Sequence, residues 1–333
     1  MTQPDDLLAA YDALLLDLDG TVYRGGEAVP GAVEAIKASR ERGAGIRYVT
    51  NNASRKPASV AAHLNELGFQ ASDDEVSTSS QAGAAVLAEH LEPGALVLIV
   101  GTQALADEVT AVGLTTTRTY SPEVAAVVQG HSPDTGWSDL AEAALAIRNG
   151  AFWVACNIDA TLPTERGLMP GNGSMVAAVR TATDVEPVVA GKPARPLMDQ
   201  AIRSAGASKP LVVGDRLDTD IAGATAAELD ALLVLTGVAT PAQVLQAPAE
   251  LRPRYLSADL SGLLLPLSEV EIAKQPGWDV AVGDGELTVT GSGDPLALLR
   301  GLCAAWWPAG GGPVTVRATD DASMAALGAL NIG

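Results

Sequence analysis

Two carboxylates stand two residues apart at the end of an apolar run. Three leucines (residues 14–16) lead into Asp17, and Asp19 follows before a Gly-Thr pair. Side chains alternate along a strand, so Asp17 and Asp19 point the same way where a strand over this run ends. Two such acids repel each other unless a cation joins them, and Mg²⁺ prefers oxygen ligands of this kind. The alternative interpretation is a charged strand end followed by a glycine turn.

A second polar cluster follows a second apolar run. Residues 46–49 predict a short strand, and Thr50 and Asn51 come directly after it. A hydroxyl and an amide there can donate hydrogen bonds to a phosphoryl oxygen. Capping of the helix predicted over 57–67 is the alternative, and both can hold together because a helix N-terminus is itself an anion site.

The third and fourth clusters lie in the second half of the chain. Lys192 follows a short apolar run, stands in a Gly-Lys-Pro sequence and precedes a predicted helix, without the glycine pattern of a P-loop. Asp215 and Asp220 follow the apolar run 211–213. Asp218, between them, is expected to face solvent or to cap a helix.

Strand and helix patterns alternate along most of the chain, which predicts an α/β protein with a parallel sheet. Ligands in such sheets bind beyond the carboxyl ends of the strands, where all four polar clusters lie. We predict a doubly wound core, an inserted α/β cap domain and a small C-terminal extension. The core covers residues 1–80 and 187–266, the cap 81–186 and the extension 267–333.

The C-terminal extension predicts the element order ββαβα. Its first two strands, 278–282 and 286–290, are joined by Gly-Asp-Gly, which is typical of a hairpin. This order resembles part of an acetyltransferase fold. Gly291-Ser292-Gly293 before the helix does not by itself indicate a coenzyme A site, so a docking or dimerisation element is the preferred interpretation.

Composition limits the class of partner. The 333 residues carry a formal net charge of −19, which argues against nucleic acid and anionic membranes as partners. The N-terminus does not read as a signal peptide and no apolar run reaches the length of a membrane span, so the cytoplasm is expected. Cys156 and Cys303 match no metal-ligand spacing and are expected to be buried, reduced thiols.

Together, the four clusters resemble the four motifs of the haloacid dehalogenase superfamily of phosphatases. They occur in the family's order between about residues 11 and 266. A cap placed between the second and third motifs is similar to the NagD and 4-nitrophenyl phosphatase branch. The acidic, alanine-rich whole chain, with its extension, is most similar to the actinobacterial glycerol 3-phosphate phosphatases.

The resemblance implies hydrolysis of a phosphomonoester through an aspartyl-phosphate. Asp17 is the implied nucleophile, and Asp19 is the implied general acid and then base. The remaining implied roles are Mg²⁺ bound by the side chains of Asp17 and Asp215 and the backbone carbonyl of Asp19, support of the metal site by Asp220, and phosphate binding by Thr50, Asn51 and Lys192.

The implied substrate is glycerol 3-phosphate, with 2-phosphoglycolate, pyridoxal phosphate or a nucleotide as alternatives. Substrate choice is expected in the irregular cap loop over 157–173, which we predict to hold no regular element. Polar residues there are expected either to meet substrate hydroxyls or to order the loop: Asn157, Asp159, Thr161, Thr164, Glu165 and Arg166.

Two other classes of function stay open from the sequence. A non-catalytic sensor of a phosphorylated metabolite needs no pair of acids at positions 17 and 19, so their presence favours an enzyme. A phosphotransferase that passes the phosphoryl group to an alcohol uses the same residues. For assembly, a homodimer through the cap or the extension is one possibility, and the sequence leaves the oligomeric state open.

Overall fold

The computed structural model describes residues 6–164 and 166–332. The chain forms two compact units. The first contains residues 1–47, 67–69 and 205–333, and the second contains 48–66 and 70–204. This is a coarser division than the predicted core, cap and extension, whose boundaries stay a prediction.

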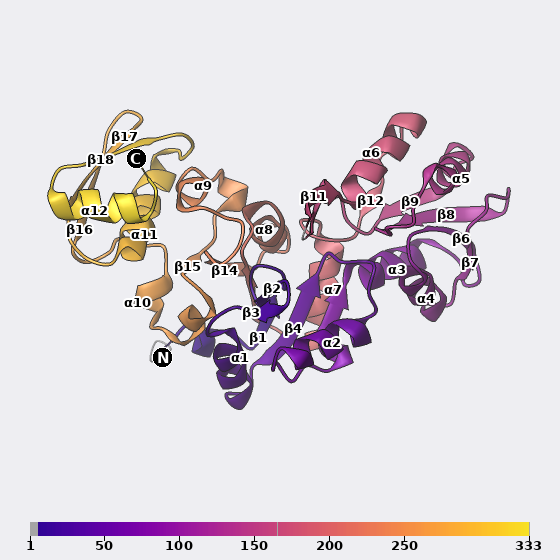
Figure 1. The fold of residues 1–333 in the computed structure, drawn as a ribbon, viewed down its shortest axis with the longest axis horizontal. Coiled ribbons are helices and arrows are strands. Elements are labelled where there is room, and N and C mark those ends of the chain that lie inside the picture. The colour runs from indigo at the N-terminus through magenta and orange to yellow at the C-terminus, as the bar shows by residue number, and fades with distance from the viewer. Residues whose placement is uncertain (1–5, 165, 333) are drawn as a thin grey trace. The chain divides into compact units, whose positions relative to one another are not determined.

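A parallel sheet forms the centre of the first unit (Figure 1). Strand β13 pairs in parallel with β1 and β14, and β14 pairs in parallel with β15. All four residues of β1 are buried, which explains why this strand is a continuous apolar run rather than an alternating one. The bounds are β1 Ala13–Leu16, β13 Pro210–Gly214, β14 Asp230–Val234 and β15 Tyr255–Ser257.

The next strand in the sheet, β4 (Gly45–Thr50), begins in the first unit and ends in the second, where β5 (Val76–Thr78) pairs with it in parallel. A short hairpin follows β1. Its two strands, β2 (Tyr23–Arg24) and β3 (Glu27–Ala28), have two residues each. The helices of the core part of the first unit are α1 Ala32–Glu41, α8 Ala222–Ala226, α9 Pro241–Leu245 and α10 Leu267–Val270.

The second unit has its own five-stranded sheet, in the order β12-β9-β8-β6-β7. Helices α5 and α6 pack on one face through small and branched side chains, and α3 and α4 lie on the other face (Figure 1). The strands are β6 Leu96–Val100, β7 Thr115–Thr117, β8 Val124–Gln129, β9 Phe152–Ala155 and β12 Val188–Val189, and the helices are α2 Pro57–Glu66, α3 Ser79–His90, α4 Gln103–Ala111, α5 Trp137–Arg148, α6 Asn172–Thr183 and α7 Arg195–Ala205. The predicted α/β architecture is confirmed.

The predicted absence of regular structure over 157–173 is wrong. This segment contains an antiparallel hairpin, β10 (Thr161–Thr164) with β11 (Gly167–Pro170). Two prolines within strands hid this hairpin in the sequence, because proline is tolerated in strands only where its missing N–H is not needed. The very short strands β5, β7 and β15 were also missed, since three residues carry little periodic signal.

The predicted ββαβα extension is confirmed. Strand β16 (Trp278–Val282) pairs antiparallel with β17 (Glu286–Gly291), and β17 pairs in parallel with β18 (Thr315–Ala318). Helix α11 (Pro295–Trp306) precedes β18, and α12 (Asp321–Ala329) follows it.

Both cysteines are free and buried, as expected. Burial raises the pKa of the Cys156 thiol to about 12, so this thiol stays protonated and unreactive. Within the described part of the chain, no helix has both the length and the hydrophobicity that a bilayer span requires.

Asp320 joins α12 to the sheet of the extension. Its carboxylate accepts hydrogen bonds from Thr290 Oγ1 at 2.6 Å, Ser323 N at 2.7 Å and Gly291 N at 2.9 Å. These bonds hold the pKa of Asp320 below its usual range. A depressed folded-state pKa stabilises the fold above the unfolded pKa of about 3.9, and this stabilisation is lost as the pH falls through the folded value.

We therefore expect Asp320→Asn to lower the urea midpoint of unfolding at pH 7. The difference from wild type should shrink below about pH 4, where the unfolded carboxyl is protonated. Asp284→Asn, an exposed change of the same charge in the extension, is the matched control. A pH-independent difference would show that the contribution of Asp320 does not depend on its charge.

Candidate metal and phosphate site

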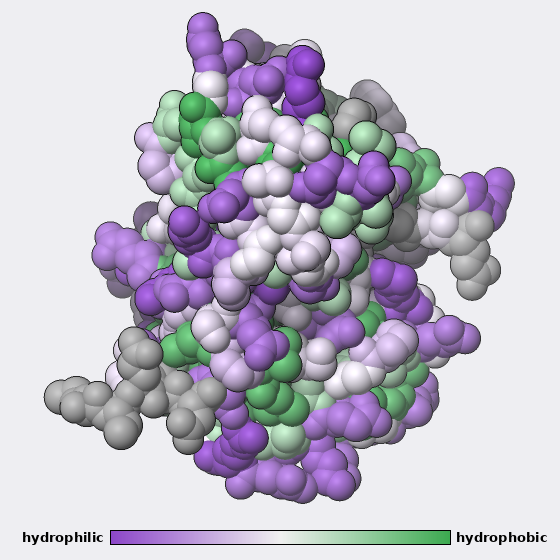
Figure 2. All heavy atoms as spheres, turned by 90° about the vertical axis from the view of Figure 1, so that its left-hand side faces the viewer, coloured by the Kyte–Doolittle hydropathy of each residue, from purple (hydrophilic) through white to green (hydrophobic). Residues whose placement is uncertain are grey.

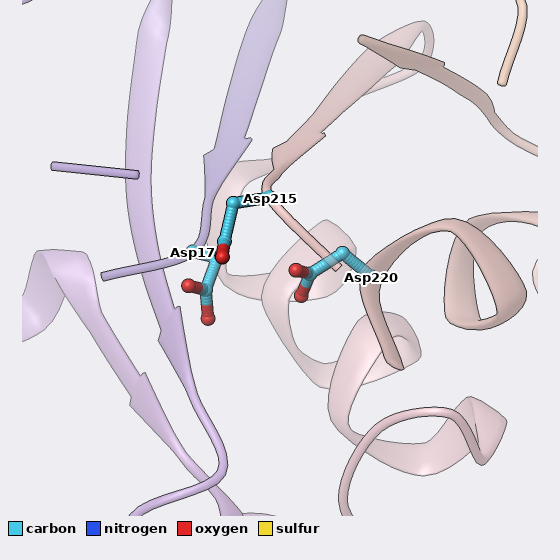
Figure 3. A group of neighbouring side chains, drawn as sticks. All are labelled: Asp17, Asp215 and Asp220. Atoms are coloured by element: carbon cyan, nitrogen blue, oxygen red, sulfur yellow. The ribbon is translucent and has the colours of Figure 1, made fainter. Parts of the chain in front are cut away.

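Three carboxylates meet at the carboxyl ends of β1 and β13 in the first unit. One oxygen each of Asp17, Asp215 and Asp220 lies within 4.8 Å of the other two. The side chains converge from β1, from the end of β13 and from the helical turn after it (Figure 3). Asp215 and Asp220 are buried, and Asp17 is half-buried.

The backbone of residues 236–239 holds Asp215 in place. Its Oδ2 accepts the N–H of Val238 at 2.7 Å, and its carbonyl accepts the N–H of Ala239 at 3.0 Å. A Cβ at position 237 would lie 1.8 Å from Asp215 Oδ2, so only glycine lets this backbone approach the carboxylate. Thr236 Oγ1 also donates to the carbonyl of Gly20 at 2.5 Å. The sequence showed these residues only as a turn after a strand.

Asp220 and Asp218 have different surroundings although they are two residues apart. Asp220 is 1% exposed, and its Oδ2 accepts the N–H of Arg216 at 3.2 Å. Asp218 is exposed and pairs with the Arg216 guanidinium at 2.8 and 3.0 Å, which lowers the pKa of Asp218. The expectation that Asp218 faces solvent is confirmed.

Asp19 lies two residues after Asp17 in the sequence and three residues beyond the end of β1. Asp19 is exposed by its solvent-accessible surface, but the protein atoms around its carboxyl still desolvate it and raise its pKa. A hydrogen bond from the backbone N–H of Gly25 acts in the opposite direction. A raised pKa favours the protonated form that a general acid requires.

Lys192 and Asn51 form a second group, in the second unit. The amide of Asn51 accepts the N–H of Lys192 at 2.8 Å and donates to the carbonyl of Lys192 at 2.9 Å. The Lys192 side chain is buried, and its Nζ donates to the carbonyl of Val49 at 3.1 Å. A Cβ at position 191 would lie 2.7 Å from Asn51 Oδ1, so glycine at this position permits the pairing.

Two of the predicted substrate residues, Asn157 and Asp159, contact Asn51, and Thr50 precedes Asn51 in the chain. Asn157 Nδ2 donates to the carbonyl of Asn51 at 2.7 Å, and its Oδ1 accepts the N–H of Asp159 at 3.2 Å. The Asp159 carboxylate accepts from Asn51 Nδ2 at 3.3 Å. Thr50 Oγ1 accepts the N–H of Asn52 at 3.1 Å. Asn157 is only 5% exposed, so its bonds favour the alternative that it orders the loop.

Arg166 is exposed in the turn between β10 and β11, and its backbone N–H donates to Thr164 Oγ1 at 3.2 Å. Glu165, another candidate of this loop, lies outside the described residues. The group of Asp17, Asp215 and Asp220 belongs to the first unit, and the group of Thr50, Asn51 and Lys192 belongs to the second.

The donor set of the first unit suits a hard cation. Three carboxylates provide oxygen ligands only, and Mg²⁺ binds through a few carboxylates together with waters and phosphate oxygens. Acids this close to one another repel, and a bound cation lowers that repulsion, so the cluster fits Mg²⁺. An α/β fold with such a cluster beyond the strand ends is typical of metal-dependent enzymes, because ligands bind at these strand ends and a bound cation can stabilise negative charge.

Comparison with known families covers most of the chain. A model of haloacid dehalogenase-like hydrolases matches residues 14–115, and a HAD-hydrolase-like model matches 189–263. A model of the GCN5-related N-acetyltransferase like domain matches residues 275–332.

Two curated relatives are phosphatases. The D-glycerol 3-phosphate phosphatase of Mycobacterium tuberculosis is 51% identical over 331 residues, which cover 95% of this chain and 93% of that protein. The acid sugar phosphatase of Staphylococcus saprophyticus is 36% identical over 78% of this chain and 99% of its own length.

Among solved structures, the glycerol phosphate phosphatase of M. tuberculosis in complex with magnesium is similar over nearly the whole chain. Its TM-score is 0.94 at 50% identity, and the match covers 98% of this chain and 99% of that one. The chain therefore belongs to the haloacid dehalogenase-like hydrolases and is a phosphatase.

The contrast between Asp220 and Asp218 provides a test of the cluster. We expect Mg²⁺ to raise the melting temperature of the wild-type protein, since a ligand at a hundredfold excess over its Kd stabilises by about 2.7 kcal/mol. Asp220→Asn should reduce this gain because it removes one acid from the trio. Asp218→Asn should keep it, and an equal gain in both variants would exclude Asp220 from the metal site.

Proposed function

We propose that this phosphatase hydrolyses glycerol 3-phosphate in a Mg²⁺-dependent reaction. The observation that carries the substrate is the 51% identity to the M. tuberculosis D-glycerol 3-phosphate phosphatase over 95% of the chain. Two observations support Mg²⁺ as the metal. The similar glycerol phosphate phosphatase of M. tuberculosis was solved in complex with magnesium, and this chain has the trio of acids.

In the first step, an oxygen of Asp17 attacks phosphorus, and the bond from phosphorus to the glycerol oxygen breaks. Asp19 gives its proton to the leaving alkoxide, so glycerol departs neutral and Asp17 carries an acyl phosphate. Because an ordinary aspartate is ionised at neutral pH, this role requires a raised pKa, and desolvation of the Asp19 carboxyl acts in that direction.

In the second step, the oxygen of a water molecule attacks phosphorus, and Asp19 takes the proton that this water loses. The bond from Asp17 to phosphorus breaks, which releases inorganic phosphate and restores both acids. When bound, Mg²⁺ would supply charge neutralisation, with the Asp17 and Asp215 side chains and the Asp19 backbone carbonyl as ligands and Asp220 in support.

The phosphate needs local positive charge because the chain as a whole carries −19. Lys192 is assigned to this role, and Thr50 is assigned as a hydroxyl donor. The Asn51 side chain is engaged by the Lys192 backbone on both sides, which supports a role in positioning that lysine. Among the cap residues, Asp159 and Arg166 are the proposed contacts to the glycerol hydroxyls.

The compartment and assembly belong to the same proposal. Free buried cysteines fit a reducing compartment such as the cytoplasm. A homodimer through the cap or the extension stays a prediction, which light scattering of the full chain can measure.

Substitution of Asp17 and substitution of Asp19 should block different steps of the reaction. With p-nitrophenyl phosphate, whose leaving group needs no protonation, Asp19→Asn should release about one equivalent of nitrophenolate per enzyme and then stall. Asp17→Asn should give no burst, because it lacks the nucleophile. Stopped-flow absorbance measures both, with Asp218→Asn as a fully active control. A burst in Asp17→Asn would remove the nucleophile assignment.

The substrate is tested by phosphate release with Mg²⁺ over a panel of small phosphomonoesters. The kcat/KM for glycerol 3-phosphate should be at least about tenfold higher than the values for 2-phosphoglycolate, pyridoxal phosphate and mononucleotides. The cap residues proposed to bind the glycerol hydroxyls would lack these hydrogen-bond partners in the other substrates. Preference for a nucleotide would overturn the substrate but keep the mechanism. Phosphate release only after an acceptor alcohol is added would indicate a phosphotransferase.

A further inference from the structure

The segment that holds Asp215 continues into helix α9. Thr240 caps α9, and its Oγ1 accepts the N–H of Gln243 at 3.3 Å. At the end of α9, the carbonyl of Leu245 accepts the indole N–H of Trp307 at 3.1 Å. Trp307 directly follows α11, so the C-terminal extension binds the helix that follows the metal-site loop.

Arg252 strengthens this connection from the core side. Its Nε donates to the carbonyl of Ala247 at 3.0 Å, and its Nη1 donates to the carbonyl of Trp307 at 3.3 Å. Its guanidinium carbon also lies 5.4 Å from the centre of the Trp307 ring, within the range of a cation–π contact. The segment after α9 is thus joined to both the backbone and the ring of Trp307.

A second connection starts from the middle of α11. Arg300, which is 5% exposed, donates from Nη1 to the carbonyl of Leu256 in β15 at 3.2 Å. The carbonyl of the next residue, Ser257, accepts the N–H of Leu235 at 3.2 Å. Leu235 directly precedes the Thr236-Gly237 turn, so α11 supports the metal-site loop at its beginning as well as beyond its end.

The extension does not fit an acyl-coenzyme A site at its glycine-rich turn. A Cβ at position 291 would lie 2.1 Å from the carbonyl of Gly277, and one at 293 would lie 3.1 Å from Trp278 Nε1, so close packing explains both glycines. The following helix is capped by the carboxylate of Asp294, which accepts the N–H of Ala297 at 2.7 Å. An anion already occupies the helix end that a pyrophosphate would need.

The outer surface on this side of the molecule carries interspersed hydrophilic and hydrophobic residues (Figure 2). The contacts of α11 and Trp307, by contrast, are directed to the core part of the same unit. The observations therefore favour a role inside this unit.

We propose that the acetyltransferase-like extension is a brace that positions the metal-site loop 236–239, with Trp307 as its positioning residue. The inference rests on the proposed role of Asp215 as a Mg²⁺ ligand. Loss of the indole donor loosens α9, lets the Val238 N–H move away from Asp215 and weakens Mg²⁺ binding. The chemistry at saturating Mg²⁺ stays the same, because the reacting groups are not altered.

Two adjacent tryptophans provide the matched test. Trp307→Phe removes the donor to Leu245 in the core, whereas Trp306→Phe removes a donor to Gly312 within the extension, a bond of 2.9 Å. Titration calorimetry of the full-length protein with Mg²⁺ alone should show a Kd raised about three- to tenfold for Trp307→Phe. Trp306→Phe should stay within about twofold of wild type.

Hydrogen exchange of the metal-free protein is the second readout. Exchange of the amides in 236–247 should speed up in Trp307→Phe but not in Trp306→Phe. Unchanged Mg²⁺ affinity together with unchanged exchange in Trp307→Phe would overturn the brace. If Trp307→Phe does not fold, Arg252→Lys provides the same test. A lysine ammonium cannot replace the guanidinium that donates to the carbonyls of both Ala247 and Trp307.

The outcomes for the brace and for the proposed function are distinct. Absence of Mg²⁺ binding by the wild-type protein would contradict the metal-dependent function. The exchange measurement on the metal-free chain would then still decide whether Trp307 positions the loop. Unaltered kcat at saturating Mg²⁺ in Trp307→Phe is expected, and a large loss there would contradict a role through the metal alone.

Discussion

Mutual repulsion among Asp17, Asp215 and Asp220 is the constraint on which the first unit depends. At the 4.8 Å that bounds their oxygens, two unit charges interact by about 3 kcal/mol at an effective dielectric constant of 20. The sheet brings these acids together through the parallel pairing of β1 with β13, so the fold itself creates the repulsion. The Val238 N–H from the 236–239 loop offsets part of it at the Asp215 carboxylate, and a bound divalent cation would offset more.

Lys192, the proposed phosphate contact, has a different constraint. The chain around it is acidic as a whole, and the lysine is held almost fully out of water. Burial would favour the neutral amine, but the carbonyl of Val49 accepts from the Lys192 ammonium and the Asn51 amide fixes the backbone at both ends of the residue. These hydrogen bonds give a long, flexible side chain and its backbone a fixed position.

The sequence identified the elements that carry long periodic patterns and the polar residues that follow them. The carboxyl ends of parallel strands meet at one edge, so Asp17 and Asp215 were predicted as neighbours despite their separation in the chain. The support of Asp215 by residue 238 was not visible, because a backbone donor has no residue type. The raised pKa of Asp19 depends on desolvation in the folded chain, and the prolines within the hairpin over 161–170 hide its strand pattern. These features arise from tertiary packing, which local patterns do not encode.

The extension also changes what an optical measurement of this protein reports. Aromatic residues make up only 4% of the chain, and three of its five tryptophans, at positions 278, 306 and 307, lie in the last sixty or so residues. Trp278 and Trp306 are buried, and Trp307 contacts the guanidinium of Arg252. Intrinsic fluorescence is therefore weighted towards the extension and its contact with Arg252, while Trp137 and Trp153 report on the second unit.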